Sequence, residues 1–210
     1  MFHVKHRPTP WPFLHGGDEL DRYAQWLSGP GVERGLIGPR ETDRIWDRHI
    51  LNCAVVEALV APGSVVVDVG SGAGLPGLVL ALVRPDLMVH LVEPMIRRTE
   101  FLSEVIEDIG VGDRLVVHRA RAQDVVGSVS GDVVTARAVM SLDRLVPLCA
   151  PLVRPGGVIL ALKGARAADE LRSARSALER HGFFHPQILT LGEGIVAPPT
   201  TVVSLAGTIP

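Results

Sequence analysis

The sequence predicts an α/β fold, a mostly parallel sheet with helices on both faces, preceded by a small helical N-terminal part. From Ser64 onward, short β-branched runs alternate with amphipathic segments, the pattern of strands joined by crossover helices. The chain has 210 residues, of which 47% are hydrophobic, enough to bury one full core. Two apolar runs separated by a short Gly/Pro turn close the chain and predict an antiparallel hairpin added to the sheet.

The front of the chain divides into two parts before the α/β region. Residues 1–17 are rich in Pro, His and Gly and are expected to form a flexible basic arm. Residues 18–62 are expected to form a helical extension, because apolar residues recur there at helical spacing and Thr42 is placed to cap a helix that runs to about Val60. Residues 63–210 then make up the Rossmann-like α/β domain.

The α/β region itself predicts seven strands and three helices. The strands are expected at 65–69, 87–93, 114–118, 132–136, 156–163, 185–191 and 200–207. The helices are expected to begin at Pro76 and to span 95–109 and 166–181.

Charge and cysteine content exclude several classes of protein. A net charge of -2 argues against a general nucleic-acid coat but leaves room for a local basic surface. The two cysteines, Cys53 and Cys149, lack metal-site spacing, so no metal site and no disulfide framework are expected. No apolar run is long enough for a membrane span or a signal peptide, which indicates a cytoplasmic protein with no membrane partner.

A glycine-rich turn follows the first strand, in the stretch DVGSGAGLPG. Asp68 ends the strand, and Gly70, Gly72 and Gly74 form the turn before the next helix. Such a turn lets a ligand approach the backbone beside a helix N-terminus. Glu93 ends the second strand, where a carboxylate can accept both hydroxyls of a ribose. The pattern indicates a nucleoside-cofactor site, the alternative being a tight turn without a ligand.

The turn alone does not identify the cofactor, because Gly72, Gly74 and Gly77 also satisfy the dinucleotide pattern G-x-G-x-x-G. Three features favour S-adenosylmethionine: the acid at Asp68, the polar third-strand sequence RARAQD, and the terminal hairpin. Together they resemble the class I S-adenosylmethionine-dependent methyltransferase fold, in which a seven-stranded sheet ends in an antiparallel strand. A nicotinamide-dependent oxidoreductase is the less favoured reading, since no catalytic proton donor is evident.

Longer motifs make the resemblance more specific. The stretches DVGSGAGLPGLVLA, LVEPMIRRTEFLSEV, RARAQD, TARAV and LALKG, in this order, resemble the 16S ribosomal RNA guanine-N7 methyltransferase G family, also called glucose-inhibited division protein B. The match spans about residues 36 to 165 and includes RHILNC upstream. The family usually has Asp and Ser where this chain has Asn52 and Cys53, and often Glu in place of Gln123, so no catalytic work is assigned to the first two.

The resemblance implies that Gly70 and Leu75 contact the cofactor, that Ala122 and Gln123 surround its adenine, and that Arg137 lies at the mouth of the site. With the residues of the glycine turn, the expected cofactor-binding set is Asp68, Gly70, Gly72, Gly74, Leu75, Glu93, Ala122, Gln123 and Arg137.

Transfer of a methyl group to guanine N7 needs no general base, because N7 carries a lone pair and no proton, so catalysis can rest on in-line placement. Arg137 and Lys163, both at strand ends, are expected to position the substrate, since Arg and Lys match the acceptors on that edge of guanine. Arg137 could instead pair with a carboxylate, and Lys163 could be a solvated strand end. The candidates for RNA binding are Arg97, Arg98, Arg121 and Lys163.

The front part adds aromatic and basic residues that could extend an RNA surface across the mouth of the site. Trp26 and Trp46 are expected in the core instead, and His49 is expected to serve packing. The resulting interpretation is a monomeric enzyme that modifies 16S ribosomal RNA or the small ribosomal subunit and releases S-adenosylhomocysteine. The alternatives are a methyltransferase of another RNA or small molecule, and a non-catalytic ribosome-assembly factor that keeps the cofactor pocket.

Overall fold

The computed structural model describes residues 7–8, 11–137 and 140–207, and its centre is one seven-stranded sheet. The strand order is β3-β2-β1-β4-β5-β7-β6, with β1 to β5 parallel and β7 antiparallel to both of its neighbours. The strands are β1 (Val65–Val69), β2 (Met88–Val92), β3 (Leu115–His118), β4 (Gly131–Arg137), β5 (Val153–Lys163), β6 (Gln187–Leu191) and β7 (Thr200–Ala206). The predicted parallel sheet with a terminal antiparallel hairpin is confirmed.

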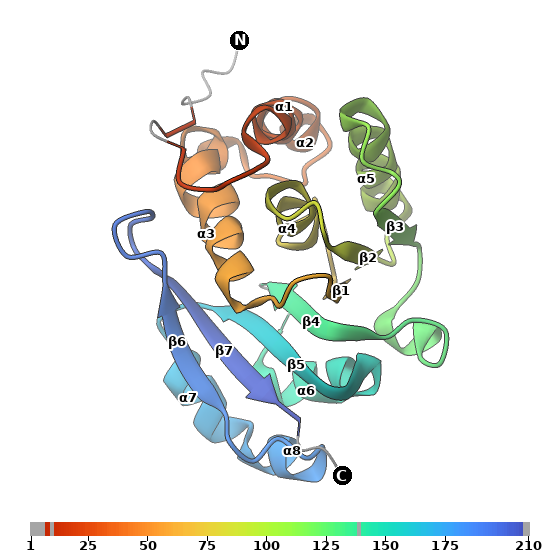
Figure 1. Ribbon diagram of the computed structural model, residues 1–210, viewed down its shortest axis with the longest axis vertical. Coiled ribbons are helices and arrows are strands. Elements are labelled where there is room, and N and C mark those ends of the chain that lie inside the picture. Colours follow the sequence, from red (N-terminus) through yellow and green to blue (C-terminus); the bar gives the residue numbers. More distant parts are fainter. Residues whose placement is uncertain (1–6, 9–10, 138–139, 208–210) are drawn as a thin grey trace.

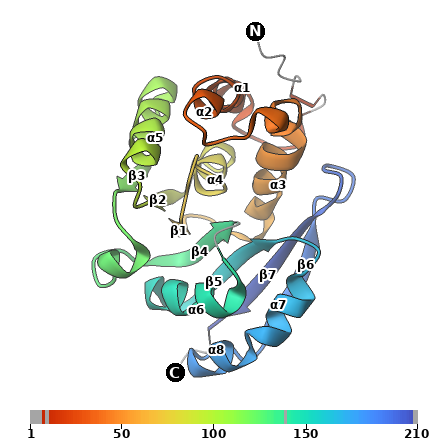
Figure 2. The ribbon, with the colours of Figure 1, turned by 180° about the vertical axis from the view of Figure 1, so that it is seen from behind.

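Helices cover both faces of this sheet (Figures 1 and 2). On one face lie α1 (Gly17–Ser28), α2 (Pro30–Glu33), α3 (Leu51–Ala54), α4 (Gly77–Val83) and α5 (Ile96–Ile109). On the other lie α6 (Leu142–Cys149), α7 (Ala167–Ser173) and α8 (Arg175–Arg180). The single helix expected over 166–181 is wrong in one respect, because Ala174, at φ -84° and ψ -3°, separates α7 from α8. Within the described residues, no helix has the length and apolar character needed to cross a membrane.

The regular helix expected from Thr42 to Val60 is also wrong. The segment winds continuously but changes pitch, from a 3₁₀ turn η1 (Pro39–Arg44) through a π-helical turn η2 (Ile45–Ile50) and α3 to a 3₁₀ turn η3 (Val55–Leu59). Thr42 is not its cap, since the winding already begins at Pro39 and the Thr42 hydroxyl donates to the Pro39 carbonyl at 3.0 Å. Irregular helical turns of this kind often occur at functional sites.

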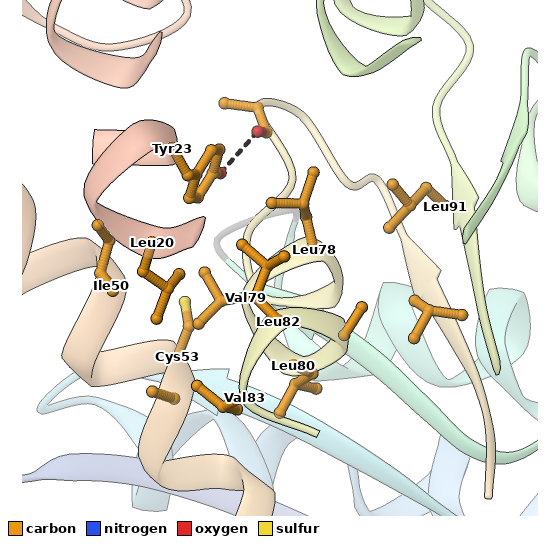
Figure 3. Close-up of a cluster of buried hydrophobic side chains, with 14 of the residues drawn as sticks. Leu20, Tyr23, Ile50, Cys53, Leu78, Val79, Leu80, Leu82, Val83 and Leu91 are labelled. Atoms are coloured by element: carbon orange, nitrogen blue, oxygen red, sulfur yellow. Dashed lines mark hydrogen bonds between the residues drawn. The ribbon is translucent and has the colours of Figure 1, made fainter. Parts of the chain in front are cut away.

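The helical extension and the sheet share one hydrophobic core. Leu20 and Tyr23 of α1 pack with Cys53 of α3 against Leu78 and Leu82 of α4, and all five are buried (Figure 3). Trp46 is buried in the same core, and Trp26 packs against it, as expected. Of the expected N-terminal arm, residues 1–6 and 9–10 lie outside the described residues, whereas Trp11 and Phe13 pack against the core. Burial of these side chains fixes the extension against α4 on this face of the sheet.

Candidate functional site

Asp68 anchors the glycine turn from below. Its side chain is fully buried, and its carboxylate accepts hydrogen bonds from the Gly77 amide at 3.0 Å and the Thr135 hydroxyl at 3.1 Å. Burial raises the pKa of Asp68 to about 6, and these hydrogen bonds oppose that rise. A β-carbon at Gly77 would lie 2.7 Å from the Asp68 β-carbon, so only glycine allows this close approach.

The turn above Asp68 is held from the other side by the helical extension. Gly74 has φ +105°, and a β-carbon there would lie 2.9 Å from the Leu78 β-carbon. The Tyr23 hydroxyl of α1 donates to the Ala73 carbonyl at 2.7 Å, entirely inside the core (Figure 3). The turn is therefore fixed by contacts from two elements far apart in the sequence.

Glu93 connects the turn to the end of β2. The residue is 1% exposed, and its carboxylate accepts from the Gly72 amide at 3.0 Å and the Met95 amide at 3.0 Å. The Arg98 Nη1 donates to the same carboxylate at 3.3 Å, while the buried Arg98 Nε has no hydrogen-bond partner among the described residues. The carboxylate and this free N–H lie together beside the glycine turn.

A cavity of about 500 Å³ opens over the turn. Five members of the predicted cofactor set line it, namely Gly70, Gly72, Leu75, Glu93 and Arg137. The other four members are not among the described residues that line it. Asp68 lies beneath the turn, and Gly74 packs against α4. Ala122 and Gln123 lie in the turn η4 (Ala122–Val125), where Ala122 is buried and Gln123 is exposed. Volumes of this size hold nucleoside-sized ligands.

Sequence reasoning missed part of this lining. Leu36 and Ile37 contribute apolar walls from the loop before η1, and His49 and Met95 also line the cavity. The apolar pair inside an otherwise Gly/Pro-rich loop was the available signal for the first two. For His49 the sequence favours a hydrogen-bonded packing role over contact with a ligand, and the structure places it on the cavity.

Arg137 ends β4 and reaches the helical extension. Its Nη2 lies 2.7 Å from His49 Nδ1, and its Nη1 lies 3.0 Å from Cys53 Sγ. Both nitrogens also donate to backbone carbonyls, those of Arg48 and His49, at 3.3 Å each. No carboxylate in the described chain pairs with it, so the alternative of an ion pair is not what the structure shows. The guanidinium instead ties β4 to the π-helical turn.

A second and larger cavity, of about 1050 Å³, adjoins the first across Arg137, which lines both. Most of the residues that line it are polar or charged. Its basic residues are Arg44, Arg48, Arg137, Lys163 and Arg166, and its acidic residues are Asp47, Asp143, Asp169 and Glu170.

Lys163, at the end of β5, lines the larger cavity but is only 7% exposed. Its ammonium donates to the Met140 carbonyl at 2.5 Å and lies 2.9 Å from Glu170 Oε2. The alternative of a solvated strand end is therefore wrong. Glu170 also accepts from the Leu142 amide at 3.2 Å, so the pair joins β5, α6 and α7.

The other predicted RNA-binding residues are dispersed. Arg97 and Arg121 are exposed and belong to the described lining of neither cavity. Arg98 lines the smaller cavity and pairs with Glu93.

Comparison with known proteins identifies the family. The sequence model of the family described as rRNA small subunit methyltransferase G matches residues 17–196 of this chain. A relative from Mycolicibacterium gilvum named ribosomal RNA small subunit methyltransferase G is 55% identical over 87% of this chain and 81% of its own.

Two solved structures share the fold at low sequence identity. A precorrin-6y C5,15-methyltransferase from Geobacter metallireducens has a TM-score of 0.55 and 15% identity, covering 83% of this chain and 91% of that one. An S-adenosylmethionine-dependent O-methyltransferase from Thermotoga maritima has a TM-score of 0.59 and 13% identity, covering 75% and 64%. The fold is the predicted class I methyltransferase fold, and the chain belongs to the rRNA small subunit methyltransferase G family.

Proposed function

We propose that this chain transfers the methyl group of S-adenosylmethionine to N7 of one guanine in 16S ribosomal RNA. The family supports a ribosomal RNA substrate. The observation that carries the proposal is that Arg137 forms a wall of two adjoining cavities, a small one over the glycine turn and a larger polar one. Because the two cavities meet at Arg137, reactants bound in them can come together beside its guanidinium for direct transfer.

The smaller cavity fits a nucleoside cofactor. Gly72 and Glu93 present a backbone turn and a carboxylate, and the unpartnered Arg98 Nε offers a buried N–H that a bound ligand would satisfy. When bound there, S-adenosylmethionine supplies a sulfonium methyl group and leaves as S-adenosylhomocysteine. Asp68 and Gly74 act by shaping the turn, whereas Ala122 and Gln123 are proposed to lie near the adenine.

The larger cavity is proposed to receive the guanosine. Because guanine N7 has no proton to lose, the site needs positioning groups rather than a base. Arg44, Arg48 and Arg166 line this cavity and suit the phosphates and the acceptor edge of guanine. Lys163, held by Glu170, is proposed to shape the cavity floor and to present one face of its ammonium to the RNA.

The exposed Arg97 and Arg121 are proposed to contact RNA farther from the reacting base. With a net charge of -2, diffuse attraction to RNA is weak, so a structured substrate such as the small ribosomal subunit is favoured. Because described residues of one chain line both cavities, we propose a monomer. A ribosomal substrate would place the reaction in the cytoplasm.

The test is transfer of labelled methyl groups to small ribosomal subunits that lack the modification, with protein-free 16S ribosomal RNA in parallel. The expected result is label in a single guanine, mapped as N7-methylguanosine. Label in another base or in other RNA would overturn the assignment of N7 or of substrate. No transfer despite measured binding of S-adenosylhomocysteine would favour the ribosome-assembly factor.

A further inference from the structure

A chain of three side chains leads from the surface of the helical extension to Arg137. Glu41 of η1 accepts from Arg48 at 3.2 Å and lies 3.2 Å from His49 Nε2. His49 Nδ1 lies 2.7 Å from Arg137 Nη2. The imidazole is 11% exposed, so these two contacts account for both of its ring nitrogens.

The chemistry of the partners fixes the protonation of His49. A guanidinium only donates, so Nδ1 must be the acceptor and the ring proton must reside on Nε2, from which it is donated to Glu41. Burial, with the nearby Arg137 charge, lowers the pKa of His49 to about 4, opposed by Glu41. The imidazole is therefore neutral at pH 7, as the acceptor role requires.

The position of Arg137 needs such a support. Its remaining partners are Cys53 Sγ and two carbonyls at 3.3 Å in the irregular stretch of helix. The contact to His49 is the shortest of the four. A guanidinium on a long flexible side chain loses its preferred orientation when its best acceptor is removed.

We propose that His49, oriented by Glu41, is the positioning residue for Arg137, holding the guanidinium in the wall shared by the two cavities. The inference rests on the proposed function, since it assigns Arg137 a place beside both the cofactor and the guanosine. It gives two residues of the helical extension, Glu41 and His49, a role in positioning Arg137. The extension then positions the chemistry as well as packing against the sheet.

Two conservative variants separate the contacts of His49. In His49→Asn the side-chain oxygen takes the place of Nδ1 and keeps the acceptor for Arg137. In His49→Gln the amide reaches toward Glu41 but leaves the Nδ1 position without an acceptor. A packing role predicts the opposite order, because Gln is closer to His in volume.

The measurement is kcat/KM for methyl transfer to small subunits, with the affinity for S-adenosylhomocysteine and the thermal midpoint measured on the same full-length samples. His49→Asn should stay within about threefold of the wild type, and His49→Gln should lose about tenfold or more, as for loss of a charged hydrogen bond. His181, whose hydrogen bonds among the described residues go to the Ala177 and Leu178 carbonyls of α8, provides the matched control His181→Asn, which should leave methyl transfer unchanged. Equal losses in both variants, or a smaller loss in His49→Gln, would overturn the proposal.

A second arm does not depend on replacing a buried side chain. Glu41→Ala removes the Nε2 partner and should lower transfer several-fold, and Glu41→Gln, which retains an acceptor oxygen, should restore most of it. Equal activity of Glu41→Ala and the wild type would contradict the positioning chain. If the wild type transfers no methyl group, the proposed function fails. The positioning of Arg137 is then tested by affinity for S-adenosylhomocysteine alone, for which the variants should rank in the same order.

Discussion

At the scale of single residues, Asp68 shows how one buried acid serves a binding turn without touching the cavity above it. Its two oxygens accept from Gly77 and Thr135, and its side chain has no solvent contact. These hydrogen bonds favour the charged form of the acid, whereas burial, the larger effect, favours the neutral form.

Replacing Asp68 by Asn should change how stability depends on pH. Because the folded pKa of about 6 lies above the ordinary value of 3.8, the native state binds this proton more tightly than the unfolded chain. Wild-type stability should therefore fall, relative to Asp68→Asn, as pH rises from about 4 to about 6, by about 3 kcal/mol in total, and stay level above.

Urea denaturation of both proteins at intervals from pH 4 to pH 8 measures this difference. Asp113, whose side chain is 77% exposed, gives the control Asp113→Asn, for which no such trend is expected. If the difference in free energy of unfolding between the wild type and Asp68→Asn did not change with pH, Asp68 would be charged in the folded protein over the whole range.

At the scale of elements, the glycine turn depends on α1, because the only tyrosine of the chain donates from that helix to the Ala73 carbonyl. Tyr23→Phe keeps the ring but leaves the buried carbonyl without this donor, at a cost of about 1–3 kcal/mol. Ala73 lines the smaller cavity, so affinity for S-adenosylhomocysteine should fall several-fold as well. Calorimetric titration and thermal unfolding measure the two effects.

The control for Tyr23→Phe is Trp26→Phe, which removes a hydrogen bond to Asp108 at the exposed surface. That variant should bind S-adenosylhomocysteine like the wild type. If Tyr23→Phe also binds normally, the contact from α1 does not shape the turn.

The ends of β5, α6 and α7 are joined by the pair of Lys163 and Glu170. Glu170→Leu should destabilise the fold by about 2–4 kcal/mol, because it leaves a largely buried ammonium with the Met140 carbonyl alone. Lys163→Met with Glu170→Leu should cost less than the sum of the two single changes. Chemical denaturation of the four proteins completes the double-mutant cycle, and simple additivity would mean that the pair is not coupled.

At the scale of the whole molecule, the parts of the fold predicted correctly are those encoded locally. The β-branched runs and the turn after Asp68 carry their signal within a few residues, so sheet, hairpin and turn followed from the sequence. The irregular winding around His49 was not predictable in this way. Its shape accompanies hydrogen bonds from Arg137, which lies 88 residues farther along the chain.

The same distinction holds within the site. Gly72 and Glu93 were found because each lies at or just after the carboxyl end of a predicted strand, and the structure places both on the cavity. The partner of Lys163 on α7 depends on tertiary packing, so the sequence left open a solvated lysine. Contacts between elements far apart in the sequence cannot be predicted from hydrophobic periodicity, whichever residue types make them.

The shared core also determines whether the α/β region can fold without the helical extension. We expect residues 63–210, expressed without the helical extension, to fail to form a stable fold, although they contain the whole sheet. Removal of the extension would uncover Leu78, Val79 and Leu82, and would delete buried partners such as Leu20 and Tyr23, each worth about 1.5–3 kcal/mol. Nine large side chains of the extension belong to this core, and their combined contribution is as large as the net stability typical of a domain. Circular dichroism melts and solubility of the shortened chain measure the effect against the full chain, with residues 1–62 added as a separate peptide to test for rescue. A cooperative melt of residues 63–210 alone, at a midpoint close to that of the full chain, would show that the sheet and its remaining helices form an independent domain.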